Sequence, residues 1–526
     1  MKNKGMKTNA IISGTFSLTL STVIVKLLGL IYKIPLAAIL GDEGMGYFNS
    51  AYAVYSFFFL LCTAGVPKAV MILVSKNNTE GKNEESEHLV SSAARLFLII
   101  GLILFIIFST FSIPISKLIG NSKAWTTMLA VAPSIIFISL SSVIRGYLSA
   151  NMRLLEIAVS QVIEGVGKLA VGLIAAQLSA NANMPPEMIS AMTILGVSFG
   201  ALVGMVYLFI VSKIKITKHK TRQKSTLGPI FKISLPITVS AGIMSLTGII
   251  DLGLIMRSLE SIGYTELEAT ALYGNYTTLA VPIFNLAIAI ITPISIAFLP
   301  IFTSSIASKN FTQLNEAEES ALKLTSALTA PMTVGLIAFS NEILALLFPK
   351  SENEIGAMLL CLLAPATIFF SLLLIVNNSL EAGGRVRAPL ISMSIGCIVK
   401  ITVSLLLIKN PSFGISGAPI GTVLSYCTAL IISLIIYRIE YGRNININTG
   451  LSRSFVFAIL SVLLSKSVFK FLLSRFSQNV ALLIAIFLCA ILYFGIYLSF
   501  ELISSRGQLK IAKYTNFSPS NCKLNT

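Results

Sequence analysis

Apolar runs of about twenty residues recur from one end of this chain to the other, and each could cross the ~30 Å hydrocarbon core of a bilayer as a helix. Short polar segments separate the runs. Only 12% of the 526 residues are charged, whereas soluble domains have about 25%. These features exclude an ordinary soluble protein and predict an all-α integral membrane protein.

The apolar runs and their polar interruptions predict fourteen membrane-spanning helices. Their expected ranges are 10–32, 47–75, 88–114, 125–150, 155–178, 188–212, 228–255, 270–305, 323–347, 356–382, 389–408, 415–437, 454–469 and 479–503. The run 270–305 contains Pro282, Pro293 and Pro300. Because proline removes a backbone hydrogen bond and crowds the preceding turn, a bent helix is expected there.

The distribution of cations predicts how the spans are oriented. The chain has 39 Lys and Arg, of which 22 lie in the segments on the N-terminal side of the membrane and 8 in the loops on the other side. Cytoplasmic loops carry the excess of Lys and Arg. We therefore expect both termini in the cytoplasm, and we attribute the net charge of +17 to these loops and not to nucleic-acid binding.

An internal repeat divides the chain. Residues 132–173 match 364–405 without gaps at an offset of 232, with 14 of 42 positions identical, including Pro133/Pro365 and Lys168/Lys400. This predicts two pseudo-symmetric six-helix lobes, 1–220 and 221–445, followed by two further helices and a cytoplasmic tail in 446–526. Parallel repeats of this kind are typical of transporters, which bind substrate between the repeats.

Cations inside spans are candidates for substrate binding, because a charge in the membrane is costly and usually faces a cavity or a partner. Lys26, Lys33, Lys68 and Arg257 are the candidates. An excess of cations over acids in the early spans predicts an anionic substrate, phosphate in particular. The alternative for Lys33, Arg257 and Arg145 is that the long side chain reaches to the membrane surface.

Four further residues are candidates for coupling or for intramembrane ion pairs. Glu164 and Lys168 have the spacing of a favourable helical pair, which would either neutralise itself in the bundle or take part in transport. Lys400, the repeat counterpart of Lys168, has no such neighbour and needs an anion from elsewhere. Asp251 is the obvious candidate, and Glu381 is the second.

Catalysis is not expected. The chain has no phosphate-binding loop, since GVGKLA at 165–170 lies within a span and lacks the terminal Ser or Thr. Five of its six Cys lie in apolar runs, and the sequence has no metal-ligand spacing. We expect a transporter, with neither a metal nor a cofactor.

Two segments and the repeat resemble a known superfamily. The segments are KLLGLIYKIPLAAILGDEGMGYFNSAYAVYSFFFLLCTAGVPKAV (26–70) and YGNYTTLAVPIFNLAIAIITPISIAFLPIFTSSI (273–306). They resemble the polysaccharide-transport branch of the multidrug/oligosaccharidyl-lipid/polysaccharide exporter superfamily. Within it, the chain is similar to the group that contains stage V sporulation protein B and the lipid II flippases.

The resemblance implies an alternating-access flippase in the bacterial cytoplasmic membrane. It would move a polyprenyl-diphosphate-linked sugar to the outer leaflet for cell-wall synthesis, with membrane lipids and cell-wall synthesis proteins as partners. Lys26 and Lys68 correspond to basic residues that bind the diphosphate in this group. The chain departs from the pattern at Tyr32 and Tyr276, where the flippases have Arg. The resemblance also implies that the ammonium of Lys400 replaces a sodium ion beside Asp251.

Two other functions remain open. One is a cation-coupled multidrug exporter of the same superfamily, although such exporters have twelve spans and an acidic site. The other is a non-transporting membrane scaffold for wall or spore assembly, which would give no reason for buried lysines. Among glycans, lipid II, a teichoic or capsular precursor and a spore-cortex intermediate all present a diphosphate.

Overall fold

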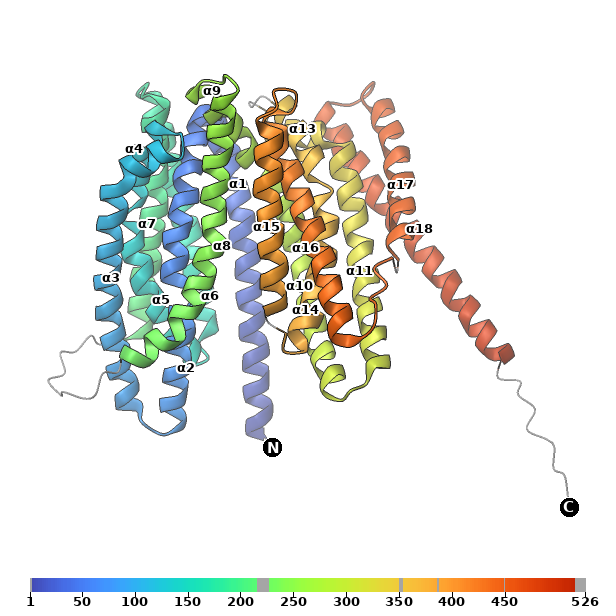
Figure 1. Cartoon of the computed structure of the whole chain (residues 1–526), viewed down its shortest axis with the longest axis horizontal. Helices are drawn as coiled ribbons and strands as arrows, with labels where there is room; N and C mark the ends of the chain where they lie inside the picture. The colour runs from blue at the N-terminus through green and yellow to red at the C-terminus, as the bar shows by residue number, and fades with distance from the viewer. Residues whose placement is uncertain (1, 215–226, 350–352, 386, 449, 516–526) are drawn as a thin grey trace, which may run out of the picture. The chain divides into compact units, whose positions relative to one another are not determined.

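The computed structural model describes residues 2–214, 227–349, 353–385, 387–448 and 450–515; the side chains of 2–27, 501–515 and scattered further positions are outside the description. All secondary structure in these ranges is helical (Figure 1). The helices are α1 Lys2–Thr63, α2 Val66–Thr79, α3 Asn83–Leu118, α4 Trp125–Val131, α5 Ser134–Ala150, α6 Leu154–Asn181, α7 Pro186–Ser212, α8 Leu227–Ser261, α9 Glu266–Asn275, α10 Val281–Ala307, α11 Phe311–Ala338, α12 Ser340–Leu347, α13 Asn353–Leu363, α14 Ala366–Ala382, α15 Arg387–Ile408, α16 Gly417–Tyr441, α17 Leu451–Leu472 and α18 Gln478–Thr515, with short turns η1 Ser122–Ala124, η2 Tyr276–Ala280 and η3 Gly414–Ser416.

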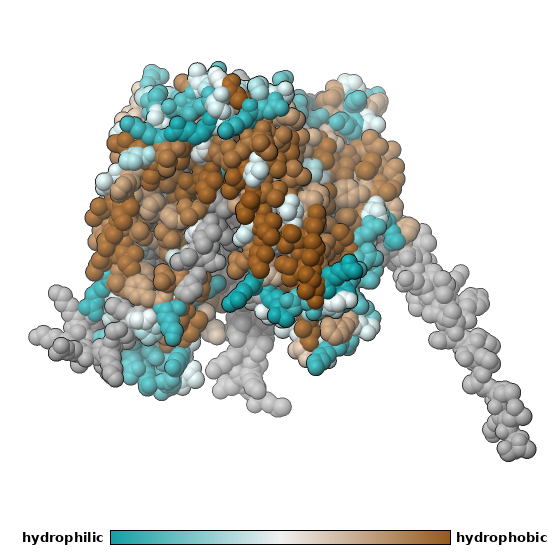
Figure 2. Space-filling view, viewed as in Figure 1, coloured by the Kyte–Doolittle hydropathy of each residue, from teal (hydrophilic) through white to brown (hydrophobic). Residues whose placement is uncertain are grey.

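The helices have the length and hydropathy of membrane spans. Within the described residues, 11 helices qualify, and a pair bent by 43°, Ser122–Val131 with Ser134–Ala150, raises the number to 12. The two other expected spans, 10–32 and 228–255, fall in α1 and α8, where many side chains are outside the description. Figure 2 shows hydrophobic side chains along the helices and hydrophilic ones gathered near their ends.

One local expectation needs correction. The polar loop expected between the first two spans is helical, because α1 continues through it and breaks only at Gly41, which has a φ of 64° that glycine adopts without strain. In 270–305, where a bent helix is expected, a π-helical turn, η2, ends at Ala280, two residues before Pro282. Such turns insert a residue into the helix and release backbone carbonyls, and they often lie at functional sites.

The internal repeat is visible in the backbone. Pro133 and Pro365 immediately precede α5 and α14, with φ and ψ of −58° and −27° in one case and −58° and −24° in the other. Both helices have 17 residues and end 232 positions apart, at Ala150 and Ala382. The ungapped sequence match therefore corresponds to a match in structure.

The chain forms two compact units. Unit 1 comprises Met1–Leu286, Leu347–Leu359 and Cys397–Gly421, and unit 2 comprises Ala287–Leu346, Leu360–Gly396 and Thr422–Thr526. The division of the sequence at 220 and 445, which was inferred from the repeat, stays a prediction. Each unit is held together by its own contacts and is described by itself.

Unit 1 packs its helices closely at glycines. A Cβ at Gly46 in α1 would collide with the Thr270 carbonyl of α9, and a Cβ at Gly274 would collide with the Asp42 carbonyl. The Nδ2 of Asn275 donates to Asp42 Oδ2 at 3.3 Å across the same crossing. The GDEGMG segment thus provides the break in α1 and the surface that α9 packs against.

Unit 2 buries its core among α10, α11, α14 and α16. The buried cluster includes Phe302, Leu322, Leu373, Val376 and Tyr437. On another side of α11, helices α17 and α18 pack through a second group that includes Ala330, Ala458 and Tyr493. Helix α11 therefore contacts both the core of unit 2 and the two C-terminal spans.

Candidate functional site

Unit 1 contains a cavity of about 490 Å³ among its spans. This is within the volume range of small-molecule pockets. Its wall combines aromatic rings from α1 with polar and charged side chains from α5 and α6. The lining residues are Tyr52, Tyr55, Ser56, Phe59, Arg145, Gln161, Glu164, Gly165, Lys168 and Val197.

The cavity contains one ion pair and one further cation. The Nη2 of Arg145 lies 2.8 Å from Glu164 Oε2, and both side chains are largely buried. The expectation that Glu164 pairs with Lys168 is corrected, because the guanidinium from α5 takes this carboxylate. The ammonium of Lys168 lies instead 4.7 Å from the centre of the Tyr52 ring and 5.6 Å from that of Tyr32.

Lys168 is therefore the uncompensated cation of the cavity. Among the described residues, no carboxylate lies within 4.0 Å of its ammonium. The two tyrosine faces stabilise the charge by cation–π attraction without neutralising it. The cavity thus offers one net positive charge beside flat aromatic surfaces.

Lys33 lies close to the π-helical turn of the same unit. Its Nζ donates to the Thr277 carbonyl at 3.0 Å and to Asn49 Oδ1 at 3.3 Å, and Asn49 Nδ2 donates to Thr278 Oγ1 at 2.7 Å. Because η2 interrupts the ordinary helical bonding, its carbonyls are free to accept such bonds. Lys33 therefore joins α1 to η2, and it does not line the cavity.

The other predicted binding residues are dispersed. Lys26 lies in α1, and its side chain is outside the described residues. Lys68 is exposed near the start of α2, one residue after Pro67. Arg257 is exposed, and it donates to the carbonyls of Lys117 and Leu118, which end α3. Arg257 thus caps a helix instead of lining the cavity.

The pair of Asp251 and Lys400 lies elsewhere in unit 1. The Nζ of Lys400 donates to Asp251 Oδ2 at 2.9 Å, which joins α15 to α8. Of the two carboxylates that the sequence offered to Lys400, Asp251 is thus the partner.

Sequence reasoning missed two features. The rings of Tyr52 and Tyr55 were not distinguished from ordinary apolar core, although their spacing with Phe59 puts them on one helix face. In unit 2, Glu318 forms an ion pair with Arg443. The expected span began at 323, which left Glu318 in a loop. The helix begins at Phe311 and buries it.

The arrangement in the cavity is suited to binding a ligand. The cavity has a cation, an ion pair, a glutamine and aromatic rings, but no paired nucleophile and base. Within the described residues, no group of three or more His, Cys, Asp or Glu could hold a metal ion. A multi-pass helical protein with such a cavity fits the class of membrane transporters.

The family is established by comparison with known proteins. The Polysaccharide biosynthesis protein family matches residues 11–306, more than half of the chain, and the chain belongs to this family. The MatE family matches residues 276–406. The chain is therefore a multi-pass membrane transporter of the multidrug/oligosaccharidyl-lipid/polysaccharide exporter superfamily and not an enzyme, as the sequence predicted.

Individual relatives cover nearly the whole chain. Stage V sporulation protein B of Bacillus subtilis (strain 168) is 24% identical over 510 residues, with 95% of this chain and 97% of the relative covered. The lipid II flippase MurJ of the same organism is 25% identical over 486 residues, with 87% and 88% covered. Both relatives are thus similar to this chain over most of its length.

A solved structure confirms the fold. The lipid II flippase MurJ in an inward closed conformation superposes with a TM-score of 0.74 at 19% identity, covering 94% of this chain and 99% of that one. The all-α membrane fold predicted from the sequence is thus confirmed. The number of fourteen spans is consistent with it.

Proposed function

We propose that this protein is a flippase that moves a polyprenyl-diphosphate-linked sugar across the bacterial cytoplasmic membrane. The observation that carries the proposal is the uncompensated ammonium of Lys168 beside the Tyr52 ring, inside a cavity of a protein of this family. A diphosphate is an anion that binds such a cation through charge-assisted hydrogen bonds. The name of one similar protein, the lipid II flippase MurJ, supports a lipid-linked substrate.

The remaining lining fits the sugar part of such a headgroup. Tyr52, Tyr55 and Phe59 offer ring faces for the apolar face of a pyranose, and the polar residue Gln161 also lines the cavity. The polyprenyl chain would stay in the bilayer, whose hydrocarbon accepts it without cost. A role in attracting the headgroup before it reaches the cavity is proposed for Lys26, Lys33 and Lys68, because each adds positive potential to the early spans.

The proposed orientation has both termini in the cytoplasm. It rests on the excess of Lys and Arg in the segments on the N-terminal side. The substrate would then bind from the inner leaflet, where polyprenyl-diphosphate sugars are made. Membrane lipids surround the protein in this role, and cell-wall synthesis proteins would supply and consume the substrate.

Cation-coupled multidrug export is the second candidate. The MatE match to residues 276–406 favours it. Such export needs an acidic site that exchanges cations, and Asp251 is the acidic residue that the sequence offers in that role. Its pairing with Lys400 at 2.9 Å opposes this role, because a tethered ammonium cannot be exchanged.

Genetic rescue tests the proposal. A bacterium whose own lipid II flippases can be switched off would receive the wild type, Lys168→Ala, Lys26→Ala, Lys68→Ala or the control Lys470→Ala, an exposed lysine of α17. We expect rescue by the wild type and the control and failure of Lys168→Ala, each with normal membrane insertion. Rescue by Lys168→Ala would discard the cavity as the headgroup site. Failure of the inserted wild type would contradict lipid II as the substrate.

A further inference from the structure

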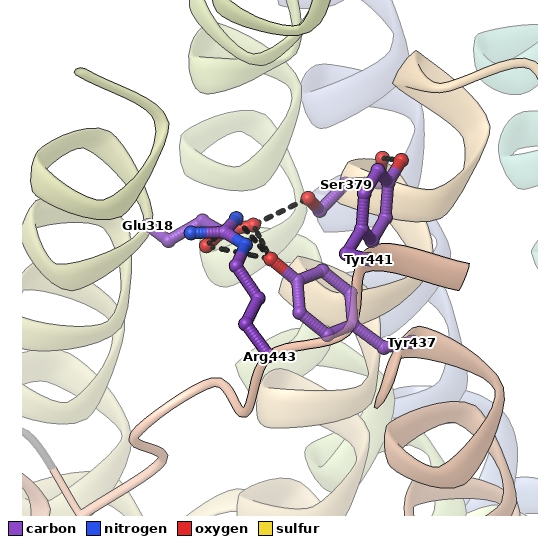
Figure 3. Close-up of polar contacts among 5 residues, drawn as sticks. All are labelled: Glu318, Ser379, Tyr437, Tyr441 and Arg443. Carbon is purple, nitrogen blue, oxygen red and sulfur yellow. Dashed lines mark hydrogen bonds and ion pairs between the residues drawn. The ribbon is translucent and has the colours of Figure 1, made fainter. Parts of the chain in front are cut away.

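A buried polar cluster in unit 2 has no part in the cavity described above. Glu318 of α11 lies at its centre and is 3% exposed (Figure 3). Ser379 near the end of α14, Tyr437 near the end of α16, and Arg443 beyond α16 all point at its carboxylate. The cluster therefore joins three spans to the segment 442–448, which we call the strap.

The carboxylate of Glu318 is fully bonded. Its Oε1 accepts from Ser379 Oγ and, at 2.9 Å, from the Tyr437 hydroxyl. Its Oε2 accepts from Arg443 Nη2 at 2.8 Å and from the same hydroxyl at 3.0 Å. A buried carboxylate is stable only with such partners, and Arg443 is the cation that balances it.

Arg443 is much less well bonded than its partner. Its Nε and Nη1 are buried and have no hydrogen-bond acceptor among the described residues. The guanidinium lies over the rings of Tyr437, Phe311 and Tyr441 at 5.3–5.9 Å, and its Nη2 also donates to the Tyr437 hydroxyl. Because two buried donors carry a desolvation cost without an acceptor, Arg443 stays in place through the charge of Glu318, the Tyr437 hydroxyl and the ring faces.

The strap can move without unwinding a span. Gly442 follows the last residue of α16 with a φ of 64°, and residues 444–446 have no regular secondary structure. Apart from Arg443, the strap contacts the core of unit 2 through Ile445, which is partly buried. Release of Arg443 would uncover the ring faces on which its guanidinium lies, but it would not require α16 to unwind.

Unit 1 joins helix ends through a neutral network. Ser86 Oγ of α3 donates to Asn78 Oδ1 of α2 at 2.8 Å. Asn78 Nδ2 donates in turn to Asn151 Oδ1 at 3.2 Å. The cluster in unit 2 uses an ion pair instead, and a carboxylate in an ion pair can respond to pH, whereas hydroxyls and amides cannot.

We propose that Glu318 exchanges Arg443 for a proton, and that this exchange releases the strap from unit 2. The proton binds at Glu318 Oε2, and the hydrogen bonds from Arg443 Nη2 to this oxygen and to the Tyr437 hydroxyl break. Arg443 keeps its own protons and its positive charge and leaves for water. The neutral acid that remains retains its bonds to Ser379 and Tyr437.

The surroundings leave Arg443 as the charge that controls Glu318. The groups that face the carboxylate are Ser379 from α14, Tyr437 from α16 and Arg443 from the strap, with the Tyr441 hydroxyl donating to the Ser379 carbonyl at 3.3 Å. A further ion pair joins the same helix ends, Arg385 with Glu440 at 2.7 Å. Its charges balance, so it adds no net charge to the cluster.

Amide hydrogen exchange, measured on the full-length protein in lipid nanodiscs, tests the proposed replacement of Arg443 by a proton. The measurement needs no substrate. Rates would be corrected for the intrinsic effect of pH and compared between about pH 8 and about pH 5. In the wild type, we expect the amide hydrogens of residues 442–448 to exchange about ten-fold faster at the lower pH. Glu318→Gln, which resembles the protonated acid, should show the fast rate at both pH values.

Matched variants exclude simpler explanations. The double variant Arg385→Gln/Glu440→Gln removes the exposed pair and should leave the strap rates and their pH dependence unchanged. If Glu318→Gln loosens all of α11, Arg443→Lys and Arg443→Gln decide the matter, since only the former keeps the charge and should keep slow exchange at high pH. Equal rates for these two variants, a protected strap in Glu318→Gln, or no effect of pH in the wild type would each overturn the proposal.

Discussion

The ammonium of Lys168 lies 4.7 Å above the centre of the Tyr52 ring. Its repeat counterpart, Lys400, instead forms an ion pair with Asp251 at 2.9 Å. Equivalent lysines in the two halves are thus stabilised in different ways: one keeps its net charge, and the other is neutralised. The neutralised pair fixes helices, whereas the charged lysine is available to an anion.

Replacing Lys168 should weaken binding of a polyprenyl diphosphate. We expect Lys168→Ala to lose about 10- to 100-fold in affinity, because a charge-assisted hydrogen bond to the diphosphate is removed. Native mass spectrometry of the purified protein with a short-chain polyprenyl diphosphate would measure this. Lys470→Ala, which alters an exposed lysine, should bind as the wild type does. Equal affinity for the two variants would contradict the assignment.

Replacing Glu164 should have the opposite effect on the same measurement. Glu164→Gln leaves the guanidinium of Arg145 without its carboxylate, so the cavity gains a second net positive charge. We expect about three- to ten-fold tighter binding of the diphosphate at low ionic strength, and a steeper loss of affinity with added salt. Weaker binding at low salt would indicate that the ion pair positions the cavity wall.

Breaking the pair of Asp251 and Lys400 should destabilise the protein. Both side chains are partly exposed, so we expect about 1–3 kcal/mol for Asp251→Asn or Lys400→Met, less than for a fully buried pair. The double variant Asp251→Asn/Lys400→Met should be closer to the wild type than the sum of the two single losses, because no unpaired charge remains. Thermal unfolding in detergent measures all three, and strictly additive losses would show that the pair is not coupled.

The close crossing of α1 and α9 should tolerate no side chain at Gly46. We expect Gly46→Ala to cost about 1–3 kcal/mol, because the new Cβ would collide with the Thr270 carbonyl. Gly29→Ala is the matched control: it lies in the same helix with nothing within 4 Å of the added Cβ, and should be neutral or slightly stabilising. Equal melting temperatures for the two variants would show that α9 moves aside.

Most of the fold follows from patterns that the sequence displays directly. Runs of apolar residues predict the spans, and the prolines at 133 and 365 mark where α5 and α14 begin. The segment between the first two expected spans was harder to predict: its polar residues indicated a loop, but α1 continues through them and is interrupted only at Gly41, which has a positive φ.

The site was less predictable because it depends on which charges meet in three dimensions. The spacing of Glu164 and Lys168 on one helix favoured a local pair, but Arg145 from another helix outcompetes the lysine for the carboxylate. Sequence reasoning missed Glu318 for a related reason. Hydropathy places a span boundary after a charged residue, whereas the helix continues and buries the residue with a partner from a distant segment.

Translocation of lipid II in liposomes that contain only this protein would test the central proposal most directly. The headgroup would be labelled in one leaflet, and its arrival in the other followed by its accessibility to an impermeant reagent. We predict that the wild type and Lys470→Ala move the headgroup much faster than protein-free liposomes do, and that Lys168→Ala is severely slowed. The proposed function would be contradicted if the wild type moved neither lipid II nor other polyprenyl-diphosphate sugars faster than protein-free liposomes do.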